Sequence, residues 1–240
     1  DEKLSFLIMD HDSTVSTDDL ELSSRGSAIR GMLGFSKDFF FLLNNDLELD
    51  LKKITDSLPT IDKKKTCIFG FTWLIYQILV KNKNMQAKKL FEELENPVII
   101  HIGGWKKLTD LSVNKEKFNE ITSNFFNTKS ENIIDFYGMT EQLGIVYPDC
   151  SEGNKHVPIF ADIFIRDVHN QKILPYNTPG FIQILSPIPN SYPGISILTD
   201  DIGEILGEDD CPCGRKGKYF VFTKRSEIAD PKGCGDTLAI

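Results

Sequence analysis

Short apolar runs alternate with helical patterns along the first two-thirds of the chain. We expect strands at four runs that are continuous but too short for buried helices: Leu4–Met9, 66–70, Val98–Ile102 and 133–136. We expect helices between them, at 24–35, 71–80 and 87–95 and at a segment that Asn114 caps. Strands separated by helices predict parallel crossovers, so this part should be an α/β layer with a parallel sheet.

The pattern changes after about Asp149. The later apolar segments are short, rich in β-forming residues and separated by Pro, Gly and Asn turns: 159–165, Gly180–Leu185, 195–198 and 219–223. They predict a small antiparallel sheet. We therefore expect an α/β subdomain at residues 1–149 and a β-rich subdomain at 150–240.

Composition limits the partners and the compartment. The chain has 240 residues, 40% of them apolar, which is enough for a sizeable core. Its net charge of -8 argues against a nucleic acid or an anionic membrane as the main partner, and no apolar run reaches the roughly 18 residues of a membrane span. Five cysteines without a secretion signal predict reduced thiols and a cytoplasmic protein. The chain begins almost within a strand, so we expect it to be a fragment.

Paired glycines follow the third predicted strand. Gly103 and Gly104 permit close backbone approach to a planar ligand, and ligands of open α/β sheets bind where the strands end. The alternative is a tight turn that places Trp105 for packing.

A second loop follows the next strand, beginning with Phe136, Tyr137 and Gly138. A flat ring can lie against this aromatic and glycine segment. The Thr140 hydroxyl can bond phosphate, and the Glu141 carboxylate can hold a cation that bridges phosphates. We expect the two loops to share one crevice.

Two carboxylates, Asp200 and Asp201, occupy a predicted β turn between Thr199 and Gly203. An aspartate beside a sugar can accept hydrogen bonds from two hydroxyl groups, so this turn could hold a ribose. A purely structural turn is the alternative.

Cysteines in the later part of the chain suggest a metal site. Cys211 and Cys213 flank a proline on a restrained loop, and Cys150 with His156 could complete a tetrahedral zinc set. The alternative is a reduced loop that faces solvent.

Cys234 lies near the C-terminus between two glycines and close to Lys232, which favours an accessible thiolate that could accept an acyl group. An ordinary tail cysteine is the alternative. Cys67, inside an apolar strand, is expected in the core.

Taken in their order along the chain, these motifs resemble those of the adenylate-forming acyl-activating superfamily. They are most similar to the acyl-protein synthetases of bacterial luminescence fatty-acid reductase complexes, which are related to phenylacetate–CoA ligases. The resemblance covers nearly the whole chain, from the glycine pair through the aromatic loop and Asp201 to the cysteine loop. It closes with Lys224, Arg225 and the Cys234 segment.

The resemblance implies a two-step reaction that uses ATP and Mg²⁺. A fatty acid carboxylate attacks the α-phosphate of ATP and gives an acyl-adenylate, and a thiol then takes the acyl group. The implied acceptor is Cys234, from which the acyl group passes to a partner protein such as a reductase subunit.

The resemblance also implies roles within the nucleotide site. Gly103 and Gly104 match the loop that flanks adenine, and the segment from Phe136 to Gly138 matches the stacking segment. Thr140 matches a phosphate contact, and Glu141 matches the carboxylate linked to magnesium. Asp201 matches the aspartate that binds ribose, and Arg225 matches a hinge-proximal arginine that also approaches ribose. The four metal candidates match a zinc-like feature of some phenylacetate–CoA ligase relatives.

The sequence departs from the family pattern at three places. The Gly- and Ser/Thr-rich phosphate loop, expected upstream of Leu4–Met9, is not in this sequence, and the polar segment 23–27 is expected to start a helix instead. Where the family usually has a glycine before the hinge arginine, this sequence has Lys224. We also expect no C-terminal lid domain, and therefore no catalytic lysine from it, as the resemblance to acyl-protein synthetases implies. Two rival functions therefore stay open: a ligase that passes the acyl group to coenzyme A, and a non-catalytic zinc-bearing module.

Overall fold

The computed structural model describes residues 3–15, 23–81, 85–105, 111–142, 144–190 and 192–226. The chain divides between Ile134 and Asp135 into two compact units, called unit 1 and unit 2 below. The expected domain bounds at residues 149 and 150 stay a prediction. Within the described residues, no helix has the length and apolar character needed to cross a membrane.

Unit 1 is built on a parallel sheet, as the sequence predicts. Its strands lie in the order β2-β1-β3-β4-β5, and the pairs β1/β2, β1/β3 and β3/β4 are parallel. Their bounds are β1 Leu4–Met9, β2 Ser36–Phe41, β3 Thr66–Phe71, β4 Val98–Ile102 and β5 Ile133–Tyr137.

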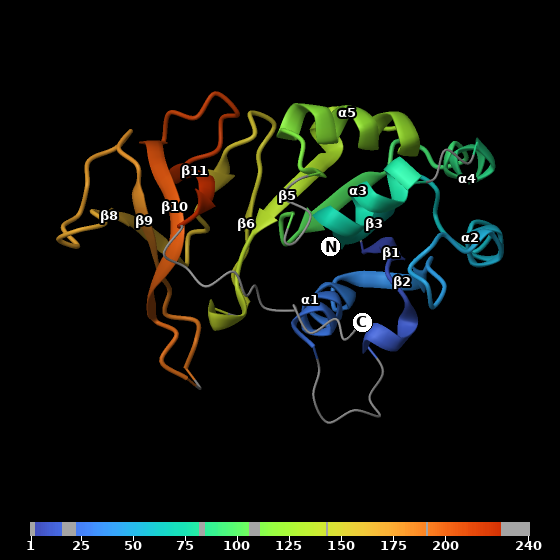
Figure 1. Ribbon diagram of the computed structural model, residues 1–240, viewed down its shortest axis with the longest axis horizontal. Coiled ribbons are helices and arrows are strands. Elements are labelled where there is room, and N and C mark those ends of the chain that lie inside the picture. The colour runs from blue at the N-terminus through green and yellow to red at the C-terminus, as the bar shows by residue number, and fades with distance from the viewer. Residues whose placement is uncertain are drawn as a thin grey trace. The chain divides into compact units, whose positions relative to one another are not determined.

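The helices of unit 1 cover both faces of this sheet. Their bounds are η1 Asp12–Val15, α1 Ser24–Leu33, α2 Leu51–Ser57, α3 Thr72–Lys81, α4 Met85–Phe91, α5 Lys115–Phe126 and η3 Ser130–Asn132. Across the sheet, the crossover from β1 leads to β2 on one side, whereas the crossovers to β3, β4 and β5 lead toward the other side. Right-handed crossovers therefore place η1 and α1 on one face and the helices α2 to α5 on the opposite face. Figure 1 shows this separation of α1 from α3 and α5.

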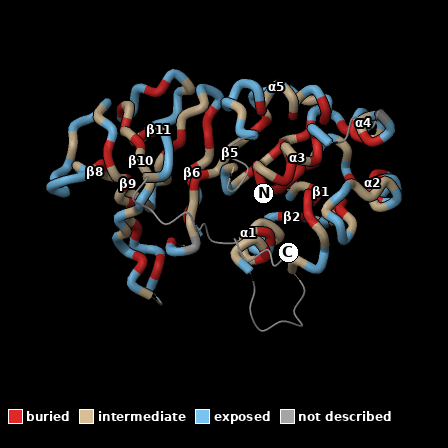
Figure 2. Tube along the Cα trace, viewed as in Figure 1, coloured by how far each residue is buried: buried red, intermediate tan, exposed pale blue. Residues whose placement is uncertain are grey.

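Burial explains which strands the sequence revealed. All six residues of β3 are buried, and β1 is buried from Ser5 onward, so both appear as continuous apolar runs. Figure 2 shows the buried residues along β1. The edge strand β2 was not predicted, because its residues alternate only weakly between exposed and buried and begin with the polar run Ser-Lys-Asp. The short helix α2 was also missed.

The expected cap of α5 is confirmed. The Asn114 side chain accepts a hydrogen bond from the Lys117 backbone N–H at 2.9 Å. This bond satisfies one of the N–H groups that the first turn of a helix leaves without a partner. The helix ends at Asn127, which takes the left-handed conformation with φ 51°.

Replacing Asn114 by alanine should lower the free energy of unfolding by about 1 kcal/mol, because it removes this cap. Urea denaturation followed by circular dichroism measures the change. Asn114→Asp retains a capping oxygen and should unfold close to the wild type. Equal losses in both variants would contradict a capping role.

Unit 2 begins inside β5 and is dominated by a five-stranded antiparallel sheet in the order β7-β11-β10-β9-β8. A second antiparallel pair joins β5 to β6. The bounds are η4 Thr140–Gln142, β6 Tyr147–Pro148, β7 Lys155–His156, β8 Asp162–Arg166, β9 Gly180–Leu185, β10 Ser196–Glu208 and β11 Lys218–Arg225. The antiparallel sheet confirms the predicted change of architecture after the α/β part.

The expected β turn at residues 199–203 is wrong, because these residues lie within β10. The pairing of β10 with β9 is irregular between Leu198 and Ile202, so the strand is locally distorted there. Gly203 is needed for close packing, since a Cβ atom added to it would lie 2.4 Å from the carbonyl oxygen of Val221. The two carboxylates are thus carried by a distorted strand.

Candidate functional site

Three of the residues expected at the nucleotide site come together in unit 2. The Tyr137 hydroxyl, at the end of β5, donates a hydrogen bond of 2.8 Å to Oδ2 of Asp201 on β10. Arg225 lies directly opposite Asp201 in the register of β10 and β11. Strands β5, β10 and β11 therefore bring an aromatic hydroxyl, a carboxylate and a guanidinium from three distant segments to one place.

An aromatic cluster holds the Tyr137 ring. It is stacked on Phe222 with centroids 5.7 Å apart and an interplanar angle of 25°, and it meets Phe220 edge-on and Tyr147 at a tilt. Phe222 was not predicted as a site residue from the sequence. The period-2 alternation of β11 was the available signal, since it places Phe220 and Phe222 on one face of the strand.

The charges around Asp201 oppose one another. Burial raises the pKa of this carboxyl, the Tyr137 hydrogen bond and Arg225 lower it, and the charges of Asp200 and Glu141 raise it. Glu141 lies in η4, four residues of sequence after Tyr137, and its side chain is exposed. Glu141 is thus close enough to Asp201 to affect its ionisation.

The remaining residues of the aromatic loop are less defined. Phe136 is half-buried and pairs with Pro148 of β6, and Gly138 follows the end of β5. The backbone of Thr140 belongs to η4, but its side chain lies outside the described part of the structure. The predicted phosphate contact of Thr140 therefore stays a prediction.

The glycine pair lies in unit 1, directly after β4. Gly103 and Gly104 have φ angles of 91° and 57°, a region that glycine adopts without strain. Trp105 packs edge-on against Tyr76 of α3 and Phe118 of α5, at centroid distances of 4.8 and 6.0 Å. The packing tryptophan is therefore confirmed, and adenine binding by the glycines stays a prediction.

The four expected metal ligands converge within unit 2. The ligand atoms of Cys150, His156, Cys211 and Cys213 all lie within 4.8 Å of one another. The Sγ atoms of Cys150 and Cys211 are 3.9 Å apart, and Sγ of Cys213 is 3.3 Å from Nε2 of His156. Tetrahedral ligands at zinc–sulfur distances of about 2.3 Å are about 3.8 Å from one another, so the spacing fits a zinc ion.

Further contacts order this group. His156 stacks on Tyr219, with ring centroids 5.7 Å apart, and Asn154 Nδ2 donates to Cys211 Sγ at 3.6 Å. Burial, followed by the charge of Arg215, lowers the pKa of His156. Both effects favour the neutral imidazole, which is the form that binds a metal.

A buried lysine joins the two segments that carry Cys150 and His156. Lys155 Nζ is 3.1 Å from Oδ1 of Asp149 and 2.8 Å from Oδ2 of Asp135. The Lys155 and Asp149 side chains are only 6% and 3% exposed. Because Asp149 and Lys155 adjoin Cys150 and His156, this ion pair fixes the spacing of the two ligands.

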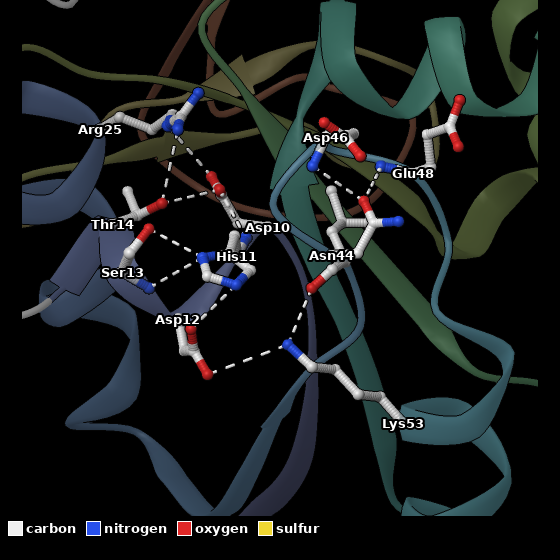
Figure 3. Close-up of polar contacts among 11 residues, drawn as sticks. Asp10, His11, Asp12, Ser13, Thr14, Arg25, Asn44, Asp46, Glu48 and Lys53 are labelled. Atoms are coloured by element: carbon white, nitrogen blue, oxygen red, sulfur yellow. Dashed lines mark hydrogen bonds and ion pairs between the residues drawn. The ribbon is translucent and has the colours of Figure 1, made fainter.

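A second polar group, which the sequence analysis missed, follows β1 in unit 1 (Figure 3). The buried Asp10 carboxylate accepts hydrogen bonds from Thr14 Oγ1 at 2.8 Å and from the His11 backbone N–H at 2.7 Å, and forms an ion pair with Arg25 Nε at 3.2 Å. Burial raises the pKa of Asp10, and Arg25 opposes this effect. The signal was the sudden Asp-His-Asp after an apolar strand, and the contacts tie β1 to the first turn of α1.

The predicted acyl acceptor, Cys234, lies outside the described residues. Cys67 is fully buried in β3, as expected, and burial raises its thiol pKa to about 12. Such a thiol is unreactive at neutral pH.

The family comparison decides the identity of this chain. The family model described as "Acyl-protein synthetase, LuxE" matches residues 2–240. The chain belongs to the LuxE family. This confirms the resemblance drawn from the motifs.

Curated relatives of this LuxE-family chain carry a consistent name. A "Long-chain-fatty-acid--luciferin-component ligase" of Vibrio harveyi is 27% identical over 195 residues, which are 80% of this chain and 50% of that protein. The protein of the same name from Aliivibrio fischeri is 26% identical over 204 residues, covering 83% of this chain and 52% of that protein. The chain thus spans about half the length of these relatives.

Solved structures confirm the fold of this LuxE-family chain. An open conformation of 2-hydroxyisobutyryl-CoA ligase matches with a TM-score of 0.66 and 15% identity, covering 93% of this chain and 48% of the other. ATP-bound MatB from Rhodopseudomonas palustris matches with a TM-score of 0.53 and 15% identity, covering 92% and 40%. The described α/β layer and antiparallel sheet are therefore part of an adenylate-forming enzyme fold.

Proposed function

We propose that the complete protein is an acyl-protein synthetase that activates a fatty acid with ATP and transfers the acyl group to a protein cysteine. The observation that carries this proposal is the family match over residues 2–240. The names of the two curated relatives support a long-chain fatty acid as substrate. The protein would act in the cytoplasm and pass the acyl group to a partner such as a reductase subunit.

The contacts in unit 2 support a nucleotide site. Asp201 would accept hydrogen bonds from the ribose hydroxyls, and Arg225, opposite it in the sheet, would approach the same sugar. The backbone of the segment from Phe136 to Gly138 would flank the flat base, and the Tyr137 ring, which stacks on Phe222, would hold this segment in place. Gly103 and Gly104 would flank the adenine.

Glu141 and Thr140 would hold a magnesium ion and a phosphate. Mg²⁺ prefers carboxylate and phosphate oxygens, and when bound it neutralises the negative charge that develops on the phosphates. The exposed carboxylate of Glu141 can reach such an ion from η4. The acyl group would then pass to Cys234.

Fatty-acid-dependent exchange of labelled pyrophosphate into ATP tests the first step. Glu141→Gln should lower the exchange rate about 10- to 100-fold, because the amide removes the negative charge offered to magnesium. Glu152→Gln makes the same change on an exposed side chain beside Cys150 and should exchange at the wild-type rate. Full exchange by Glu141→Gln would remove this role, and no exchange by the wild type would contradict acyl activation.

We also propose that Cys150, His156, Cys211 and Cys213 bind a structural zinc ion. Their mutual distances within 4.8 Å and the lowered pKa of His156, which favours the neutral imidazole, support a Cys3His set. Four protein ligands would complete a closed tetrahedral site, so the ion would stabilise unit 2 without taking part in the reaction.

A further inference from the structure

The Tyr137–Asp201 contact joins a fixed ring to a half-exposed carboxylate. The Tyr137 side chain is only 8% exposed, and Phe220, Phe222 and Tyr147 surround its ring. Asp201 comes from the distorted part of β10, where the pairing with β9 is irregular. The ring is therefore a rigid support, whereas the strand that carries the carboxylate is locally irregular.

The direction of this hydrogen bond is fixed. Burial, followed by the negative charge of Asp201, raises the pKa of Tyr137 well above its ordinary value, so the phenol stays protonated and must donate. The acceptor is Oδ2 of Asp201, at 2.8 Å. A hydrogen bond from a neutral donor to a carboxylate is among the stronger ones in proteins.

We infer that Tyr137 is a positioning residue whose hydroxyl holds the Asp201 carboxylate in the orientation that receives the two ribose hydroxyls of the nucleotide. This inference rests on the proposed function and deepens it, because it assigns the Tyr137 hydroxyl a task separate from stacking by its ring. Without that hydroxyl, the Asp201 side chain can rotate away from the sugar.

The surrounding charges make the hydroxyl more important. Asp200 on β10 and Glu141 on η4 disfavour an ionised Asp201, whereas Tyr137 from β5 and Arg225 from β11 favour it. When the Tyr137 hydroxyl is removed, Arg225 is the one group of these four that still favours the ionised form of Asp201. The carboxylate should therefore become protonated at a higher pH and accept the sugar hydroxyls less well.

Tyr137→Phe in the complete protein tests the inference, because phenylalanine keeps the ring that packs on Phe222. Isothermal titration would measure the dissociation constants of Mg-ATP and of Mg-2′,3′-dideoxy-ATP, which lacks both ribose hydroxyls. The wild type should bind ATP more tightly than the dideoxy nucleotide. The variant should bind ATP about 5- to 10-fold more weakly and the dideoxy nucleotide less than about 2-fold more weakly.

Tyr147→Phe is the matched control. Its ring belongs to the same aromatic cluster, but its hydroxyl bonds Oε1 of Gln142 at 3.2 Å instead of Asp201. It should keep the wild-type preference for ATP. A pH series adds a second readout. As the pH is lowered, ATP binding by Tyr137→Phe should begin to weaken at a higher pH than ATP binding by the wild type, because Asp201 is protonated earlier.

The outcomes separate the inference from the proposed function. If Tyr137→Phe keeps the wild-type ratio of the dissociation constants for the two nucleotides, the positioning role is wrong and the nucleotide site stands. If the wild type does not distinguish the two nucleotides, Asp201 does not bind the ribose, and the positioning role fails with it; acyl activation fails only if the wild type shows no fatty-acid-dependent pyrophosphate exchange.

Discussion

Replacing Cys234 by serine should abolish the stable acyl label that the complete protein acquires from radiolabelled fatty acid and ATP. A cysteine thiolate attacks the carbonyl carbon of the acyl-adenylate, the bond to AMP breaks, and a thioester forms. A serine hydroxyl without an adjacent base is a far weaker nucleophile at neutral pH, so the acyl group should not be captured. Gel autoradiography measures the label, and neutral hydroxylamine should remove it from the wild type.

Cys67→Ala is the control for this experiment. Its thiol is fully buried and its pKa is raised to about 12, so its loss should leave the label intact. Pyrophosphate exchange should continue in Cys234→Ser, because activation precedes transfer. A retained label in that variant would contradict the assignment. Exchange without any protein label, together with acyl-CoA formation when coenzyme A is added, would favour the coenzyme A ligase.

Replacing Cys211 by serine should remove zinc from the protein and lower its free energy of unfolding by about 4 kcal/mol. Cys211 is buried, and its Sγ lies 3.9 Å from that of Cys150, so no neighbouring thiol can replace it without moving. Loss of a structural metal is among the few changes that destabilise a protein by this much. Elemental analysis measures the zinc, and urea denaturation with and without a chelator measures the stability.

Cys234→Ser is the matched control, because it also exchanges one sulfur for oxygen but outside the four-residue group. It should retain one zinc ion and wild-type stability. The chelator should destabilise the wild type and leave Cys211→Ser unchanged. Protein purified without a chelator that contains no zinc would contradict the metal site.

Several elements could be predicted from local sequence because their burial leaves a direct trace in it. β1, β4 and β9 have the predicted bounds, since a strand buried in the middle of a layer is a continuous or regularly alternating apolar run. The cap at Asn114 was equally visible, because capping depends on neighbours within one helical turn. The edge strand β2 left no such pattern.

Some of the proposed functional residues could likewise be predicted from the sequence, whereas the contacts between them could not. Family motifs in the sequence identified Tyr137, Asp201 and Arg225 one by one, and the cysteine spacing suggested a metal. Whether Cys150 and His156 lie beside Cys211 depends on the pairing of β7 with β11, which no local pattern specifies. The turn expected around Asp201 was wrong, because distortion within a long strand depends on pairing with both neighbouring strands.

By itself, the sequence determined the α/β and β-rich parts and the acyl-activating family, and it named most of the residues of the proposed nucleotide site. These properties follow from hydrophobic periodicity and from ordered motifs, which are written along the chain. Only the tertiary structure decided that the Tyr137 hydroxyl bonds Asp201, that Phe222 stacks on the same ring, and that the four candidate metal ligands converge. Such contacts join residues far apart in the chain, and strand register and side-chain packing set them.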